Sequence, residues 1–199
     1  MTLLALGRDP AATLDLGASS EGLAEVDRCT VHVAEGAPDR SPFTSVLRVD
    51  GRAVVPDDLR GVADVGLYRV HERHVKERPV DWPVGSASPG IAAVYGTRRH
   101  PSLDRAGYDQ HWRDVHGPLA VRHHVGMWDY WQCVLDDDLL PGSVDYDGVA
   151  IVQFPSMTDL EERFFDGPEG RAAIQADAAS FNDLGTLDRV LMVEHILKG

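Results

Sequence analysis

Residues 95–124 read YGTRRHPSLDRAGYDQHWRDVHGPLAVRHH, and this stretch carries the local signals that decide the fold. Asp104 is a good helix N-cap, and Pro101 lies ahead of the expected helix rather than inside it. Gly117-Pro118 is a pair that ends or kinks a helix. The stretch therefore predicts a strand end, a turn, and a helix from Asp104 to His116.

The predicted helix has one aromatic face that ends in a histidine. Tyr108, Trp112 and Val115 recur at i, i+4 and i+7, the spacing of an apolar helix face. His116 lies one turn beyond Trp112 on that face, so the pattern places an imidazole at the edge of the core. His111 lies five residues before it and points about 140° away around a straight helix, which is poor geometry for a shared metal ion.

Apolar and alternating segments on both sides of this helix predict eight strands, and helical segments separate some of them. In each half the elements can be written β-α-β-β-α-β, the ferredoxin-like order, which makes the fold class α+β. We expect a degenerate half at 1–80, a linker rich in Pro, Gly and Ser at 81–90, and a second domain at 91–199. The predicted strands are 2–7, 29–34, 43–49, 65–76, 91–95, 125–135, 148–154 and 186–197.

Two four-stranded antiparallel sheets of this kind can pack face to face and close a barrel. If the first half is a degraded copy, both sheets come from one chain, which is then an intrachain pseudo-dimer. Otherwise a homodimer must supply the second sheet. The end of the fourth strand, HERHVKERP at 71–79, is highly charged, so it is expected to leave the sheet edge.

The composition excludes several classes of partner. A formal charge of −13 argues against nucleic acid and anionic membrane surfaces, because Lys and Arg must neutralise phosphates. No run of 18 apolar residues is present, so no membrane span is expected. Cys29 and Cys133 match no CxxC pattern and suggest no disulfide framework, which favours a cytoplasmic location. There is no HExxH, P-loop or GxGxxG signature, so no metal and no nucleotide cofactor are expected.

The second half resembles the EthD family of the dimeric α+β-barrel superfamily, over about residues 90–197. The resemblance combines W-x-x-x-H-G-P-L at 112–119 with DG-x-A-x-x-x-F at 147–154; the first half has no W-x-x-x-H unit. It implies a pocket between sheet and helices. Members of the family accompany ether-degrading oxidases, and relatives tailor aromatic polyketides; neighbouring families include isomerases, monooxygenases and haem-binding enzymes. Further matching residues are Tyr95, Arg98-Arg99-His100-Pro101, Tyr108, Tyr130, Gln132, Pro155-Ser156, Phe181-Asn182-Asp183 and Glu194.

Three residues are candidates for catalysis. His116 can both accept and donate a proton near neutral pH, although a histidine at a helix C-terminus can also merely satisfy free carbonyls. Tyr130 and Gln132 share one face of their strand, together with Trp128, because side chains alternate. A phenol and an amide there can hydrogen-bond a ring hydroxyl or an enolate, or can simply be part of the core.

Four residues are candidates for substrate binding. Trp112 and Trp128 are expected to form aromatic walls, although an aromatic stripe on a helix is more often core. Arg99, near Tyr95, can hold a carboxylate in a bidentate pair, although arginines of an acidic protein usually pair with local carboxylates.

These residues predict a cofactor-independent lyase or isomerase that uses His116 as general acid and base. The expected reactions are dehydration, decarboxylation or ring isomerisation of a small apolar oxygenated molecule, such as a phenolic, lactone or polyketide-like compound. One alternative is an oxygen-using monooxygenase or a haem enzyme of the same superfamily. The other is a non-catalytic accessory protein that binds a ligand.

Overall fold

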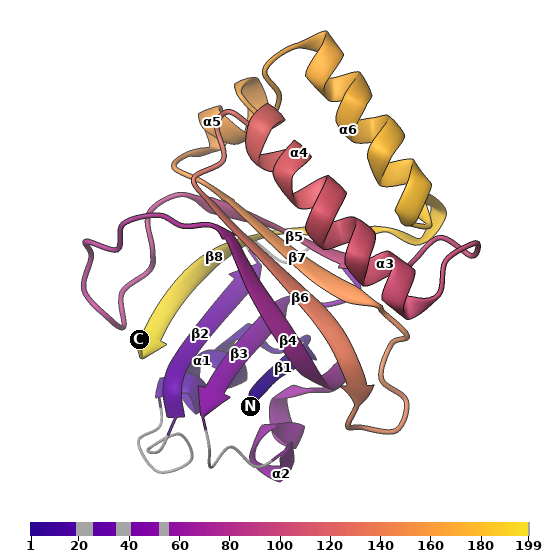
Figure 1. The fold of residues 1–199 in the computed structure, drawn as a ribbon. Coiled ribbons are helices and arrows are strands. Elements are labelled where there is room, and N and C mark those ends of the chain that lie inside the picture. Colours follow the sequence, from indigo (N-terminus) through magenta and orange to yellow (C-terminus); the bar gives the residue numbers. More distant parts are fainter. Residues whose placement is uncertain (19–25, 35–40, 52–55, 199) are drawn as a thin grey trace.

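The computed structural model describes residues 1–18, 26–34, 41–51 and 56–198, and its central feature is a closed barrel of eight antiparallel strands (Figure 1). The order around the barrel is β1-β3-β2-β8-β5-β7-β6-β4. The strands are β1 (Thr2–Gly7), β2 (Val26–Ala34), β3 (Ser45–Gly51), β4 (Gly66–Lys76), β5 (Ile91–Thr97), β6 (Asp129–Asp138), β7 (Gly148–Phe154) and β8 (Asp188–Lys198). The predicted mixed class with an antiparallel barrel is therefore confirmed.

Each half of the chain supplies four neighbouring strands to the barrel. The first half lies in the order β4-β1-β3-β2 and the second half in the order β8-β5-β7-β6. In both halves the last strand is therefore followed by the first, the third and the second. The halves are joined by the pairs β2–β8 and β4–β6, so the barrel closes within one chain. The barrel interior is filled by apolar side chains from both halves, including Leu4, Tyr68, Val94 and Ile151.

Helices cover the outside of the barrel unequally. Figure 1 shows the longer helices of the second half together on one side, over β5, β6 and β7, while α1 and α2 lie toward the other end. The first-half helices are α1 (Pro10–Ala18), α2 (Pro56–Leu59) and η1 (Arg60–Val62). Those of the second half are α3 (Arg105–His111), η2 (Trp112–His116), α4 (Gly117–His123), α5 (Met157–Glu162), α6 (Pro168–Phe181) and η3 (Leu184–Thr186).

The helix around Trp112 begins as predicted but does not end at His116. The Asp104 carboxylate caps it by accepting a bond from the Gly107 N–H at 2.7 Å. The turn η2 is then a π-turn, in which the Gly117 N–H bonds to the Trp112 carbonyl five residues back. This wider turn lets the chain pass Pro118, which cannot donate a backbone bond, so the helix continues through α4.

The π-turn also changes which residues face the core. Val115 is 47% exposed, so its predicted place on the apolar face is wrong, whereas Tyr108 and Trp112 are buried as expected. A helix with one extra residue in a turn shifts every later side chain around the axis, and the 3.6-residue period no longer applies across it.

The charged end of β4 was also predicted wrongly, because it stays in the sheet. β4 pairs with β6 as far as Lys76 and Tyr130. The Glu72 side chain is only 5% exposed and pairs with Arg28 and Arg48. Glu72 remains in this strand because it has partners of opposite charge, and His74 likewise lies beside the Asp129 carboxylate.

No helix in the described part of the chain combines the length and the hydropathy that crossing a membrane requires.

Candidate active site

A cavity of about 160 Å³ lies between the second-half sheet and its helices. Its walls are mostly apolar, and Leu184 and Leu187 are exposed at its edge. An engineered cavity of about 150 Å³ in another protein holds one benzene molecule, so this space suits a ligand with a single ring. The lining residues are Tyr95, Thr97, Trp112, His116, Ala120, His124, Tyr130, Ala150, Val152, Phe164, Ile174, Ala178, Phe181, Asn182, Leu184 and Leu187.

His116 is held by a carboxylate from the neighbouring helix α6. Its Nδ1 lies 2.7 Å from Oδ2 of Asp177, and the His116 side chain is 14% exposed. An ionised carboxylate can only accept, so Nδ1 carries a hydrogen and the neutral ring has its lone pair on Nε2. Because Nε2 bonds to none of the described residues, the cavity lined by His116 has a nitrogen that can accept a proton.

The Asp177 carboxylate binds a second histidine as well. Its Oδ1 lies 2.8 Å from Nε2 of His111. Burial raises the pKa of Asp177, but hydrogen bonds from His116 and His111 outweigh this and hold the pKa below its ordinary value. The carboxylate therefore stays ionised at neutral pH and can accept a hydrogen bond from each ring.

Tyr130 lines the same cavity, and its hydroxyl has a hydrogen to donate. Its hydroxyl accepts from Trp112 Nε1 at 2.8 Å and from Gln132 Nε2 at 3.2 Å. A phenol oxygen has two lone pairs and one hydrogen, so both acceptor positions are in use. The O–H itself has no acceptor among the described residues. Burial raises the pKa of Tyr130 to about 12, although the bonds from Gln132 and Trp112 oppose the rise, so the hydroxyl keeps its proton at neutral pH.

Two further polar residues line the cavity. His124 is 5% exposed, and its Nδ1 donates to the Phe164 carbonyl at 2.6 Å. Burial lowers its pKa to about 4, so His124 is neutral at pH 7, with Nε2 as an acceptor. The Asn182 side chain is 7% exposed, and its Oδ1 is buried without a partner among the described residues. Both groups suit a ligand that carries hydroxyl hydrogens.

The structure places four of the seven predicted site residues at the cavity: His116, Tyr130, Tyr95 and Trp112. Gln132 does not line it; its amide is fully buried and bonds to Tyr130, the Trp112 carbonyl and Arg73. The Arg99 guanidinium pairs with the Asp147 carboxylate and does not line the cavity, so it is not free to hold a substrate there.

Trp128 lies away from the cavity, contrary to the expectation that it shares a face with Tyr130. β6 begins at Asp129, so strand alternation does not extend back to Trp128. Its ring stacks on Trp82 with 6.2 Å between centroids, and the Arg78 guanidinium lies 4.8 Å from its centroid.

Sequence reasoning missed Asp177, His124 and Asn182 as site residues. Nothing in the sequence indicated a role for Asp177, because His111 and His116, which it binds, were expected on different faces of the helix. The π-turn brings residues five apart close to one face, and both then reach one carboxylate. Asn182 was noticed only as part of a motif, and its unpartnered oxygen becomes apparent only in three dimensions.

Gly148 allows Trp112 to reach its position over β7. A Cβ at Gly148 would overlap the Trp112 ring and lie 2.9 Å from the Tyr108 hydroxyl. We expect Gly148→Ala to lower the free energy of unfolding by about 1–3 kcal/mol, as overpacked cores do, and thermal unfolding measures it. The control is Gly61→Ala, because a Cβ at Gly61 has open space around it. Equal stability of the two variants would contradict the packing argument.

The fold and the cavity define a single-chain α/β-barrel protein with an apolar site beneath its second set of helices. Residues 100–185 match the model of the EthD domain, which confirms the predicted family resemblance for this part of the chain. The comparison with curated protein sequences gave no match.

Two solved structures share the fold over almost the whole chain. A candidate monooxygenase from Lactobacillus acidophilus NCFM is 7% identical, with a TM-score of 0.53, over 99% of this chain and 95% of that one. An anthrone oxidase-like protein is 12% identical, with a TM-score of 0.58, over 100% of this chain and 93% of that one. At these identities the likeness shows the fold alone.

The cavity does not fit haem, which the sequence left open as an alternative. Its volume of about 160 Å³ suits one aromatic ring and not the four pyrrole rings of haem. In the described part of the chain, no group of three or more His, Cys, Asp or Glu residues is placed to hold a metal ion.

Proposed function

We propose that this protein is a cofactor-independent enzyme that moves a proton on a small, single-ring oxygenated substrate, by lyase or isomerase chemistry. The observation that carries the proposal is the pairing of a proton acceptor with a hydrogen-bond donor in one apolar cavity. His116 offers Nε2 and Tyr130 offers its O–H. A base and an oxyanion donor are the two groups that enolisation requires.

In the proposed reaction, His116 takes one proton from the substrate and later returns it, so no other reactant is needed. Nε2 of His116 takes a proton from a carbon next to the substrate carbonyl. The C–H electron pair moves into the carbonyl, and the enolate oxygen that forms accepts the Tyr130 O–H. Asp177 stabilises the imidazolium at His116. The same Nε2–H then returns the proton to another carbon, which completes an isomerisation, or to a departing hydroxyl, which completes a dehydration.

The lining narrows the substrate class that we propose. His124 and Asn182 offer acceptors for ring hydroxyls, and the remaining wall is largely apolar and aromatic. The volume supports a phenolic compound with a single ring rather than a fused-ring polyketide. A multi-ring substrate requires the cavity to open at Leu184 and Leu187.

A second candidate reaction is oxygenation, which the names of the two similar structures favour. It begins with the same proton abstraction by His116. The carbanion then gives two electrons to dioxygen, a C–O bond forms, and the imidazolium protonates the resulting peroxide anion. Dioxygen is the required co-reactant, so substrate consumption that depends on oxygen separates this reaction from a lyase or isomerase.

Proton abstraction can be tested with phenylacetone, a single-ring ketone with benzylic C–H bonds next to its carbonyl. In D₂O we expect the protein to accelerate deuterium incorporation at the benzylic carbon, followed by proton NMR. We expect Tyr130→Phe to slow it on the order of 10²-fold, since it removes the oxyanion donor. Binding of phenylacetone without any exchange would contradict catalysis and favour the accessory-protein alternative.

We also propose that the chain is an intrachain pseudo-dimer of two ferredoxin-like units, with a domain division near residues 81–90. The matching strand order of the two halves supports this reading. The catalytic cavity belongs to the second unit, because the first lacks a counterpart of the W-x-x-x-H segment.

A further inference from the structure

The direction of the Tyr130 hydroxyl depends on how the Gln132 amide is turned. Gln132 Nε2 donates to the Tyr130 hydroxyl and, at 3.0 Å, to the Trp112 carbonyl. If the amide were reversed, its oxygen would accept the Tyr130 O–H and withdraw that hydrogen from the cavity. The observed orientation is therefore what leaves the O–H available to a ligand.

Arg73 fixes that orientation from the other end of the amide. Its Nε donates to Gln132 Oε1 at 2.8 Å, and a guanidinium can only donate. If the amide were reversed, the N–H groups of Gln132 would face the N–H groups of Arg73, and no hydrogen bond could form between them. Arg73 and Gln132 are direct register partners across β4 and β6, so the contact joins the first half of the chain to the site in the second.

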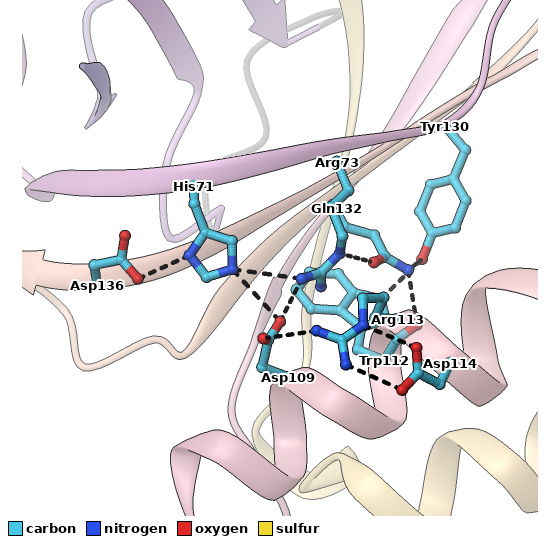
Figure 2. A network of polar contacts seen from close by, with 9 residues as sticks. All are labelled: His71, Arg73, Asp109, Trp112, Arg113, Asp114, Tyr130, Gln132 and Asp136. Atoms are coloured by element: carbon cyan, nitrogen blue, oxygen red, sulfur yellow. Dashed lines mark hydrogen bonds and ion pairs between the residues drawn. The ribbon is translucent and has the colours of Figure 1, made fainter.

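Figure 2 shows that Arg73 is itself held in place by charged neighbours. Its Nη1 pairs with the Asp109 carboxylate of α3. His71 lies 3.4 Å from the same Nη1, and Arg113 lies 3.9 Å from Asp109. The Arg73 side chain is 18% exposed, and its guanidinium carbon lies 5.9 Å from the centroid of the Trp112 ring. The carboxylate and the ring thus position the guanidinium against Gln132.

We propose that Arg73 is a positioning residue: it orients the Gln132 amide so that the Tyr130 hydroxyl donates into the cavity. The inference rests on the proposed function, in which Tyr130 binds the substrate oxygen. It also assigns a role in the site to the first half of the chain, which supplies no cavity-lining residue among those described. The positive charge of Arg73 also favours donation by Tyr130, because it lowers the pKa of the phenol and so makes the hydroxyl a stronger hydrogen-bond donor.

The test is the carbonyl stretching band of phenylacetone bound to the full-length protein. A hydrogen bond from Tyr130 shifts this band to lower frequency, and Tyr130→Phe gives the position without it. We expect Arg73→Met to lose at least half of the shift and to bind phenylacetone ~5-fold more weakly, as the loss of one hydrogen bond implies. The matched control is Arg113→Met, which removes one charge beside Asp109 without touching Gln132; we expect it to keep the full shift.

A second variant keeps the test decisive if Arg73→Met does not fold. In Gln132→Glu both side-chain oxygens are acceptors, so one can take the Tyr130 hydrogen while the other keeps Arg73. We expect this variant to lose the shift. A full shift in either folded variant would overturn the positioning role while leaving Tyr130 as the donor. A band that is the same in the unaltered protein and in Tyr130→Phe would overturn the donor itself, and with it the proposed function.

Discussion

Replacing His116 by alanine is expected to slow benzylic deuterium exchange in phenylacetone by ~10²-fold or more, as the loss of a general base does. Its Nε2 is the proposed proton acceptor, and Asp177 stabilises the charge that forms on the ring. The side chain is 14% exposed, so its removal leaves most of the buried core in place. Proton NMR in D₂O measures the rate, and circular dichroism checks that the fold is retained.

The control for this prediction is His123→Ala, at the last residue of α4 and about two helical turns after His116. His123 bonds to Asp166 at 2.9 Å and does not line the cavity. Its side chain is 13% exposed, so the control matches His116 in burial, and loss of that imidazole outside the cavity is expected to leave the exchange rate within about twofold. An unchanged rate in His116→Ala would remove this residue from the mechanism, and equal losses in both variants would point to a general structural effect.

Much of the barrel could be predicted because its strands carry strong local signals. β1 and β7 have the predicted bounds, since each is a compact apolar run between turn residues. β6 begins four residues later than expected. The aromatic residue Trp128 was assigned to the strand because it resembles its neighbours, but the preceding segment is still a turn, with the Met127 N–H bonded to the His124 carbonyl.

The candidate site could be predicted only in part, because its geometry depends on long-range contacts. His116, Tyr130 and Trp112 were found from a helix period and strand alternation, which are local patterns. Asp177 comes from a different helix, and it reaches both histidines because of a π-turn that the 3.6-residue period does not reveal. The Gln132 amide was predicted to contact the substrate because strand alternation shows that it shares a face with Tyr130. The sequence does not show that protein neighbours already occupy the hydrogen-bonding groups of this amide.

The charged end of β4 shows how composition alone misled the prediction. Strand alternation places Glu72 inside the barrel, where it pairs with Arg28 and Arg48. Both guanidiniums also lie over the Trp131 ring, 4.7 and 4.2 Å from its centroid. One carboxylate and one aromatic ring therefore compensate two cations, and the strand remains in the sheet although its sequence is hydrophilic.

This arrangement predicts a large loss of stability when the carboxylate is removed. Glu72→Gln keeps the shape but leaves the Arg48 guanidinium, which is 3% exposed, without its ion-pair partner. Breaking a buried pair by removing one partner costs about 3–5 kcal/mol. For a chain of this size that corresponds to a fall in Tm of about 6–20 °C, measured by calorimetry at neutral pH. The control is Asp137→Asn on the same strand pair, which breaks the exposed Arg69–Asp137 contact and is expected to cost less than about 1 kcal/mol.

The pH dependence of this difference gives an independent check. Burial raises the pKa of Glu72, but Arg48 and Arg28 more than offset it, so the folded-state pKa lies below the ordinary value of 4.5. A carboxylate with a lowered pKa stabilises the fold above its unfolded pKa and loses that contribution as pH falls through the folded value. The gap in unfolding free energy between the unaltered protein and Glu72→Gln should therefore be constant at neutral pH and narrow below about 4.5. A gap that does not change with pH would show that packing, and not the ion pair, is what the substitution disturbs.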